Sequence, residues 1–190
     1  RISLILLMAG IVILLGHYID FFNMIMPGTV GDQWFIGVSE IASVLFFFGL
    51  FIFGLGDSLL VQSNTGNAPW TVLAQGVANK LDISIGVSTF AISTLVLLLW
   101  IPLREKPGFG TIANIVIIAS AIQLGINVFP LSNHFLVGVV MDLVGIALVG
   151  IGSALYITCA LGPGPRDGLM TALHKRTGIR VGRVRLGIEG

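Results

Sequence analysis

Part of this sequence occurs twice, 96 residues apart, and no other feature constrains the fold as strongly. The first copy runs over residues 54–86 and the second over residues 150–182. The matching segments are Gly54-Leu55-Gly56 with Gly150-Ile151-Gly152, Gly66-Asn67-Ala68-Pro69 with Gly162-Pro163-Gly164-Pro165, and Ile83-Ser84-Ile85-Gly86 with Ile179-Arg180-Val181-Gly182. The offset holds without a gap and the shared residues are mostly Gly and Pro, so the repeat preserves a backbone path rather than a surface. In a membrane chain such a repeat is typical of transporter folds.

The composition predicts a membrane protein. Mean hydropathy is +1.00, and only 10% of residues are charged, against about a quarter in a soluble domain. Two long stretches, Ile83–Leu103 and Pro107–Asn133, contain no charged residue, and a helix needs about 20 apolar residues to cross a bilayer. Cys159 is the only cysteine, so neither a disulfide framework nor a cysteine metal cluster is expected.

The predicted fold is all-α, a polytopic transmembrane helix bundle with an inverted repeat. Spans are expected over residues 2–26, 41–61, 83–103, 109–129 and 135–161, with a sixth from Val181. Three crossings separate the second span from the fifth, so the two copies, residues 54–90 and 150–186, would enter the membrane from opposite sides. Because the counterparts of residues 95–129 would come after Gly190, we expect the chain to be a fragment, cut at both ends.

One short helix is predicted in each copy, starting after a Gly/Pro turn at Pro69 or Pro165. At about 11 residues each, these helices are too short to cross and would be amphipathic or re-entrant. In the first, the expected apolar face is Trp70, Leu73, Ala74 and Val77, opposite Thr71, Gln75 and Asn79. In the second, it is Leu169, Met170 and Leu173, opposite Asp167, Thr171, His174 and Lys175.

Basic residues predict which ends of the spans lie together. The side after the third and fifth spans carries Arg104, Lys106, Arg166, Lys175, Arg176, Arg180, Arg183 and Arg185, whereas the other side, Arg1 aside, has only Lys80. By the positive-inside rule the basic side is cytoplasmic, in a multi-pass protein of the bacterial cytoplasmic (inner) membrane. The three tryptophans, Trp34, Trp70 and Trp100, fall near predicted span ends, as an interfacial belt requires.

Four motifs resemble the YczE/YyaS/YitT family of bacterial membrane proteins. They are Gly54–Leu59, Gly66–Val72, Lys106–Thr111 and Gly162–Met170. The likeness covers about residues 44–190 in family order, and the stretch from Gly164 to Met170 is specific. Because the family is a set of integral membrane proteins, the resemblance implies a location and a fold more than an activity.

Residues 1–53 resemble something else, a helix hairpin of the membrane subunit of alternative complex III, a quinol:cytochrome c oxidoreductase of the NrfD-like group. The likeness lies in His17–Phe22, Met24–Gly31 and Ile36–Ile41. We therefore expect an N-terminal hairpin over residues 1–53 and a YczE/YitT-like membrane domain over residues 54–190, truncated at its C-terminal end. A natural fusion, a gene-assembly chimera and an engineered join all fit this pattern.

The candidate substrate-binding residues gather at the starts of the two short helices and at acids within the spans. Helix N-termini carry about half a positive charge, and discontinuous helices in transporters aim them at anionic groups. In an inverted repeat both starts could line one central cavity, where Arg166 would suit a carboxylate or phosphate. The set is Asp57, Asn67, Pro69, Trp70, Asp142, Pro165, Arg166 and Asp167. Alternatively, both turns seat amphipathic helices at opposite membrane surfaces.

Each candidate titratable group allows two interpretations. Asp57 could bind a cation or proton, or could solvate a helix end. Asp142 should face the bundle or a cavity, because a charge inside the bilayer costs about 2.5–3.5 kcal/mol, unless it is shallow enough to reach the interface. His17 and Asp20 could move protons near a quinone, or could mark where the first span meets water.

Two functions of different classes follow. The first is a transporter-like protein for an unknown small substrate, with no enzyme activity, cofactor or metal, in contact with the lipid bilayer and able to form a homo-oligomer. The alternative is a membrane subunit of a quinol-oxidising electron-transport complex, with quinone as cofactor and other respiratory-complex subunits as partners. The sequence contains no Walker loop and no haem-binding histidine pair within one span, and it does not indicate nucleic-acid binding.

Overall fold

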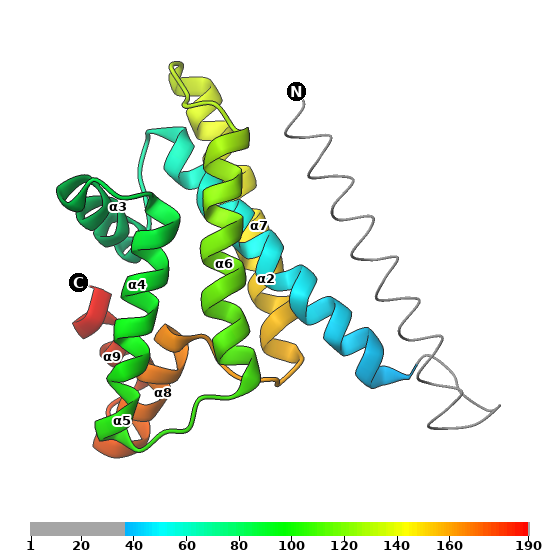
Figure 1. Cartoon of the computed structure of the whole chain (residues 1–190), viewed down its shortest axis with the longest axis vertical. Coiled ribbons are helices and arrows are strands. Elements are labelled where there is room, and N and C mark those ends of the chain that lie inside the picture. Colours follow the sequence, from blue (N-terminus) through cyan, green and yellow to red (C-terminus); the bar gives the residue numbers. More distant parts are fainter. Residues whose placement is uncertain (1–36, 190) are drawn as a thin grey trace. The chain divides into compact units, whose positions relative to one another are not determined.

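The computed structural model describes residues 37–189, and within that range it contains helices and no strand. Contacts divide the chain into two units, residues 1–41 and residues 42–190. The helices, in chain order (Figure 1), are α2 (Val38–Ser63), α3 (Pro69–Leu81), α4 (Ile85–Leu98), α5 (Trp100–Leu103), α6 (Phe109–Val128), α7 (Phe135–Thr158), α8 (Pro165–Thr177) and α9 (Val181–Glu189). The all-α prediction is confirmed.

Four segments of the described chain are long and apolar enough to cross a membrane. They are α2, α4 continued by α5, α6 and α7, and each matches a span predicted from the sequence to within a few residues. The two short helices begin at Pro69 and Pro165, as expected for proline in the first helical turn. The first predicted span, over residues 2–26, lies outside the described residues.

Helix α2 packs between α6 and α7, and glycines bring all three backbones close. A Cβ added at Gly54 would lie 2.6 Å from the Cβ of Ala121 on α6, and one added at Gly152 on α7 would lie 2.6 Å from the carbonyl oxygen of Gly49. Lipid removes the hydrophobic force between helices, so close van der Waals contact through small residues has to hold them. The largest buried side chains at this crossing are Phe46, Leu50, Phe53 and Tyr156.

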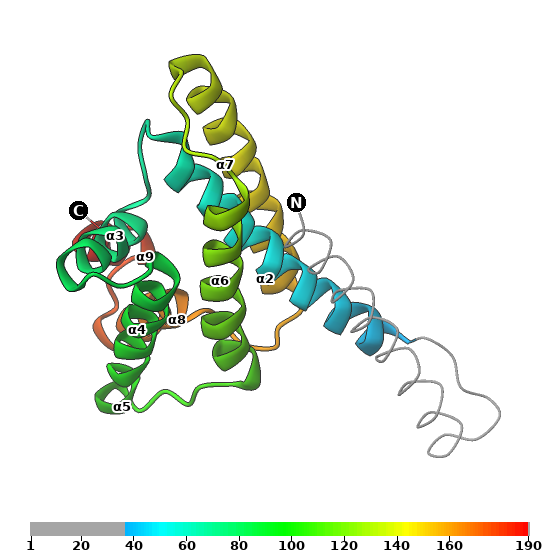
Figure 2. The same cartoon turned by 45° about the horizontal axis from the view of Figure 1, so that its top comes forward.

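Helices α2 and α7 run antiparallel (Figures 1 and 2), and their contacts repeat at the offset seen in the sequence. Gly49 packs against Gly152; the counterparts of these two residues, Gly145 and Gly56, also pack against each other. Replacing each residue by its counterpart in the other copy therefore turns one glycine contact between α2 and α7 into the other. The antiparallel direction is what an inverted repeat requires, while the superposition of the complete copies stays a prediction.

The two short helices bury different kinds of residue. On α8, Leu169 and Met170 of the predicted apolar face are buried, together with Ala172, whereas Leu173 is half-buried. On α3 the prediction was right for Ala74 but wrong for Leu73, which is 49% exposed, and for Thr71, which is buried. Close packing explains the difference: the Ser88 hydroxyl of α4 donates to the Ala74 carbonyl oxygen at 2.7 Å, and only small side chains allow that approach.

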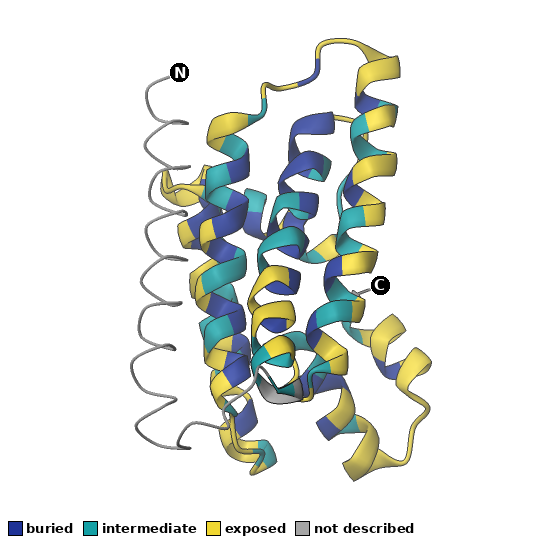
Figure 3. Cartoon of the chain, turned by 90° about the vertical axis from the view of Figure 1, so that its right-hand side faces the viewer, coloured by how far each residue is buried: buried dark blue, intermediate teal, exposed yellow. Residues whose placement is uncertain are grey.

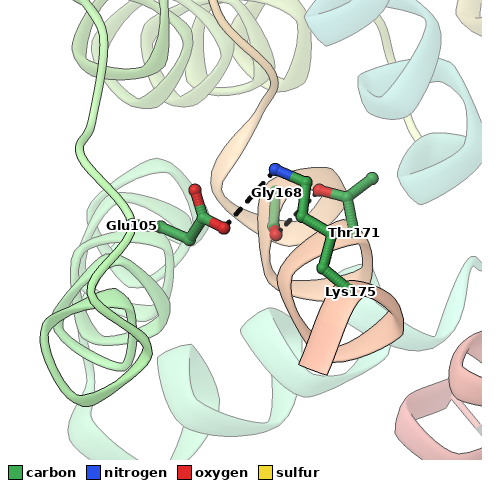
Figure 4. A network of polar contacts seen from close by, with 4 residues as sticks. All are labelled: Glu105, Gly168, Thr171 and Lys175. Atoms are coloured by element: carbon green, nitrogen blue, oxygen red, sulfur yellow. Dashed lines mark hydrogen bonds and ion pairs between the residues drawn. The ribbon is translucent and has the colours of Figure 1, made fainter. Parts of the chain in front are cut away.

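Polar contacts tie the loops together at each end of the bundle. At one end, the Lys175 ammonium of α8 pairs with the Glu105 carboxylate at 3.5 Å, beside a hydrogen bond from Thr171 to the Gly168 carbonyl (Figure 4). At the other, the Gln62 side chain donates to the Phe129 carbonyl oxygen at 2.6 Å. Residues 104–106 and α8 thus share one end, as the basic residues predicted, and the cytoplasmic assignment of that end stays a prediction.

Candidate functional site

A cavity of about 90 Å³ lies inside the bundle, between α2, α3, α4, α6, α7 and α8. Five of the eight candidate substrate-binding residues line it: Asp57, Trp70, Pro165, Arg166 and Asp167. Trp70 and Arg166 are equivalent positions of the repeat, and so are Thr71 and Asp167, which both line the cavity as well. The first turns of the two short helices therefore both contribute side chains to one cavity, while a central binding site there stays a prediction.

The loop that leads into α8 is held by the first turn of α6. The Gly110 amide donates to the Leu161 carbonyl oxygen at 3.1 Å, and the Thr111 hydroxyl donates to the Pro163 carbonyl oxygen at 2.9 Å. A Cβ at Gly110 would lie 2.5 Å from the Leu161 oxygen, so only glycine permits this contact. The motif at residues 106–111 therefore positions the start of α8, and with it Arg166 and Asp167.

Trp100 fixes the same helix from the other side. Its indole N–H donates to the Pro165 carbonyl oxygen at 3.0 Å, and its ring occupies the space that a side chain at Gly168 would need. Trp100 is only 3% exposed, so its assignment to an interfacial belt was wrong. An indole that is buried in this way needs a partner for its N–H, and the α8 backbone supplies it.

The start of α3 is held differently. The Asn67 amide donates to the Gln75 side-chain oxygen at 2.9 Å, and neither Asn67 nor Pro69 lines the cavity. Trp70 does line it, and its indole N–H is buried without a hydrogen-bond partner in the described chain. Since an unpaired buried donor costs about 1–3 kcal/mol, the Trp70 N–H is a group that a bound molecule would satisfy.

The charged groups of the cavity differ in how firmly they are held. The Tyr156 hydroxyl donates to the Asp167 carboxylate at 2.8 Å, and Tyr156 stacks edge-on against Phe53 with ring centroids 6.1 Å apart. Arg166 forms no ion pair with any residue in the range 37–189. One carboxylate is thus fixed by a hydrogen bond, whereas the guanidinium keeps its donors for another partner.

Backbone donors add to this set. Pro69 and Pro165 have no N–H, and the next two N–H groups of each helix lie before the first intrahelical hydrogen bond. The preceding residues, Ala68 and Gly164, supply no side-chain cap for them. With Trp70 and Arg166 beside them, the helix starts offer donors to a solute that carries acceptor atoms. Residues 37–189 include no cluster of three or more His, Cys, Asp or Glu side chains that could hold a metal ion.

Five polar residues of the cavity were not predicted as site residues, namely Thr71 and Thr89 on α3 and α4 and the three that follow. Tyr156 lies on α7, Asn114 on α6 and Ser93 on α4. Asn114 lies in the first third of a predicted span, between Ala113 and Ile115, and an amide inside a membrane span is itself a signal, since membrane helices turn such groups toward the bundle. Tyr156 has Leu60 as its counterpart in the repeat, so a comparison of the two copies conceals it.

Asp142 lies away from the cavity. Its carboxylate accepts a hydrogen bond from the Thr65 hydroxyl, and its second oxygen is buried without a partner among the described residues. The contact joins α7 to the loop between α2 and α3. Neither Asp142 nor Thr65 lines the shared cavity. His17 and Asp20, the candidates of the redox hypothesis, lie outside the described residues.

Comparison with known proteins identifies the family. The model of a family of unknown function, DUF6198, matches residues 40–190. An uncharacterised protein of Haemophilus influenzae is 42% identical over 142 residues, which cover 75% of this chain and 65% of that protein. The uncharacterised membrane protein YczE of Bacillus subtilis is 28% identical over 146 residues, 76% of this chain and 68% of YczE.

A third relative, YyaS of Bacillus subtilis, is 29% identical over 136 residues, 68% of each chain. The resemblance to YczE and YyaS inferred from the motifs is thereby confirmed. No solved structure matches the chain. The likeness of residues 1–53 to a redox-complex subunit stays a prediction, as does the domain boundary between residues 53 and 54.

Proposed function

The chain belongs to the DUF6198 family and is a YczE-like membrane protein, and from this premise we propose that it is a carrier for a small anionic solute that binds in the cavity between α3 and α8. The proposal describes a transporter rather than an enzyme, with no resident cofactor. It places the protein in the bacterial inner membrane as a multi-pass protein, with the end that holds Glu105 and Lys175 in the cytoplasm.

One observation supports the proposal above all others. The starts of α3 and α8 line the same cavity, and there Trp70 presents an indole N–H that has no partner in the described chain. Transporters of inverted-repeat type bind anionic groups at the N-termini of discontinuous helices near the repeat interface. Arg166, which forms no ion pair within residues 37–189, adds a full positive charge suited to a carboxylate or phosphate oxygen.

The cavity also limits the solute. Its volume of about 90 Å³ is smaller than a cavity of about 150 Å³ that accommodates benzene, so the bound group has only a few non-hydrogen atoms. Asp57 and Asp167 both line the same space as Arg166, so two carboxylates face one guanidinium, and a bound anion would be repelled by the excess negative charge in a low-dielectric interior. We therefore expect the anion to enter together with a proton or a monovalent cation that neutralises Asp57.

Uptake into proteoliposomes tests the proposal. Purified protein would be reconstituted, and the uptake of radiolabelled formate, acetate, lactate and inorganic phosphate would be measured with and without an inward proton gradient. We expect at least one of these anions to be taken up faster than in protein-free vesicles, and Arg166→Gln to reduce that uptake by tenfold or more, since the charge-assisted bonds to the anion are worth about 1.5–3 kcal/mol.

Arg176→Gln is the matched control, because Arg176 lies on the same helix and is exposed. If Arg176→Gln impairs uptake as strongly as Arg166→Gln, the anion interacts with surface charge and the proposed site is wrong. Equal rates in protein-containing and protein-free vesicles for the whole panel would exclude carriage of small anions of this class.

A further inference from the structure

The two long helices of the repeat are buried to different extents. In an apolar window of 18 residues, 56% of the positions in α2 are buried, against 17% in α7. Figure 3 colours the chain by how far each residue is buried. Yet α2 and α7 occupy equivalent places in the sequence repeat, and the contacts between them are symmetric. The difference therefore arises on the face of α2 that turns away from α7, where α6 packs.

Small residues make that contact with α6 possible. Gly54 and Gly86 each lie so close to α6 that an added Cβ would come within 2.6 Å of its side chains. A third small residue, Ser58 on α2, fills the space that a side chain at Gly125 on α6 would need. Gly54 and Ser58 are four residues apart on α2, a spacing that lets two membrane helices approach closely. Thus α6 occupies a surface formed jointly by α2 and α4.

The second copy also has small residues at the three equivalent positions. The counterparts of Gly54, Ser58 and Gly86 are Gly150 and Ala154 on α7 and Gly182 on α9. A Cβ added at Gly150 or at Gly182 would meet no atom within 4 Å, and Ala154 is exposed. Large apolar residues flank this face on both helices, namely Leu143, Ile146, Ile157 and Leu186, each more than half exposed.

We propose that the face formed by Gly150, Ala154 and Gly182 binds an apolar membrane-crossing helix that is the counterpart of α6. The occupant is the segment that follows α9 in the longer chains of this family, as α6 follows α4. The matched residues span 65% and 68% of the Haemophilus relative and of YczE, so about a third of each of these proteins lies outside the match. The inference rests on the symmetric contacts and does not depend on what the cavity binds.

The physical reason is that a bilayer gives no advantage to exposed small residues. Glycine facing lipid contributes little van der Waals contact and adds backbone freedom to the unfolded state. A second helix that enters the groove would restore the contacts that α6 makes in the first copy. It would also raise the buried share of α7 toward that of α2.

A spin label on α7 tests the proposal. In a Cys159→Ser background, which keeps a donor for the Ala42 carbonyl, the label is attached at Gly150→Cys, or at Ile151→Cys as the control. Ile151 is 53% exposed and lies on another side of the helix. The collision rate of each label with oxygen is measured in bilayers for two proteins. One is residues 1–190 alone. The other is the same chain extended by the residues that follow the counterpart of α9 in the Haemophilus relative.

We expect the added segment to lower the oxygen collision rate at position 150 by roughly threefold and to leave that at position 151 unchanged, since a packed helix interface excludes oxygen and lipid. An equal rate at position 150 in both chains would overturn the proposal. Dipolar broadening between labels at position 150 that disappears on dilution with unlabelled protein would also overturn the proposal. It would show that a second copy of the chain covers the face.

Discussion

Helices α2 and α7 are nearly equal in length and hydropathy, and they occupy equivalent places in a repeated sequence, yet one is a core helix and the other is largely exposed. In water such a difference would show in the pattern of apolar residues. In lipid it does not, because lipid tails are as apolar as leucine. The small residues carry the information instead, since Gly54 and Gly150 mark the same surface whether or not a helix covers it.

Helices α3 and α8 extend the comparison to the site. Both begin at the cavity with a proline in the first turn, so the repeat preserves the backbone path. The side chains that follow differ, with Trp70 and Thr71 in one copy and Arg166 and Asp167 in the other. The repeated helix starts thus bring different side chains to the cavity, an indole from α3 and charged groups from α8.

The largest expected effect is the difference between two equivalent glycine substitutions. Gly54→Leu should lower the free energy of unfolding by about 3 kcal/mol, because even its Cβ would lie 2.9 Å from the Ile118 carbonyl oxygen and overpacking of this degree displaces α6. Gly150→Leu should change it by less than about 0.5 kcal/mol in residues 1–190, since it faces open space. Unfolding in mixed detergent micelles, followed by far-UV circular dichroism, measures both. Equal destabilisation by the two substitutions would show that α7 is already covered.

The backbone path was predictable because it depends on residues with restricted or unusual conformational freedom. Pro69 and Pro165 mark helix starts, and the hydrophobic stretches give the spans. The opposite direction of α2 and α7 followed from counting crossings, whereas the shared cavity was one of two alternatives that the sequence left open. These are local or arithmetic properties, and they do not depend on which side chains meet.

The side-chain environment could not be predicted in the same way. Trp100 near a span end fits an interfacial belt as well as a buried anchor, and only the position of Gly168 decides between them. Leu73 was assigned to the buried face of α3 because it is apolar, but in a membrane protein apolar residues also face lipid. Tyr156 has an apolar counterpart in the repeat, so symmetry concealed its hydrogen bond to Asp167.

That hydrogen bond provides the second prediction. Tyr156→Phe should lower the free energy of unfolding by about 2 kcal/mol, because it removes a buried donor from a carboxylate. In an Asp167→Asn background the same substitution should cost less, since a neutral amide oxygen is the weaker acceptor. Chemical unfolding of the four proteins in detergent gives the coupling. A Tyr156→Phe cost that is independent of residue 167 would rule out the contact as a source of stability.

Two tryptophans distinguish the starts of the two short helices. Trp100→Phe should cost about 1 kcal/mol of stability, because it removes the hydrogen bond to the Pro165 carbonyl. Trp70→Phe should cost less stability than Trp100→Phe, since it breaks no hydrogen bond in the described chain and removes a buried donor that has no partner, and it should weaken anion uptake in proteoliposomes. The opposite result, a large loss of stability for Trp70→Phe with normal uptake, would make Trp70 a packing residue and remove it from the site.

The smallest expected effect concerns Asp142, whose counterpart in the first copy is Phe46, a fully buried core residue. Asp142 instead binds the Thr65 hydroxyl and so joins α7 to the loop before α3. Hydrogen bonds between membrane helices contribute about 0.6 kcal/mol on average, so a double-mutant cycle of Thr65→Val and Asp142→Asn should give a coupling near that value.

Because Asp142 does not line the cavity, Asp142→Asn should leave the apparent KM for the transported anion unchanged, whereas Arg166→Gln should raise it. A change in KM for Asp142→Asn with no coupling to Thr65 would mean that the loop end of α7 takes part in solute entry. The functional difference between the two copies would then include Asp142 as well as the side chains that line the cavity.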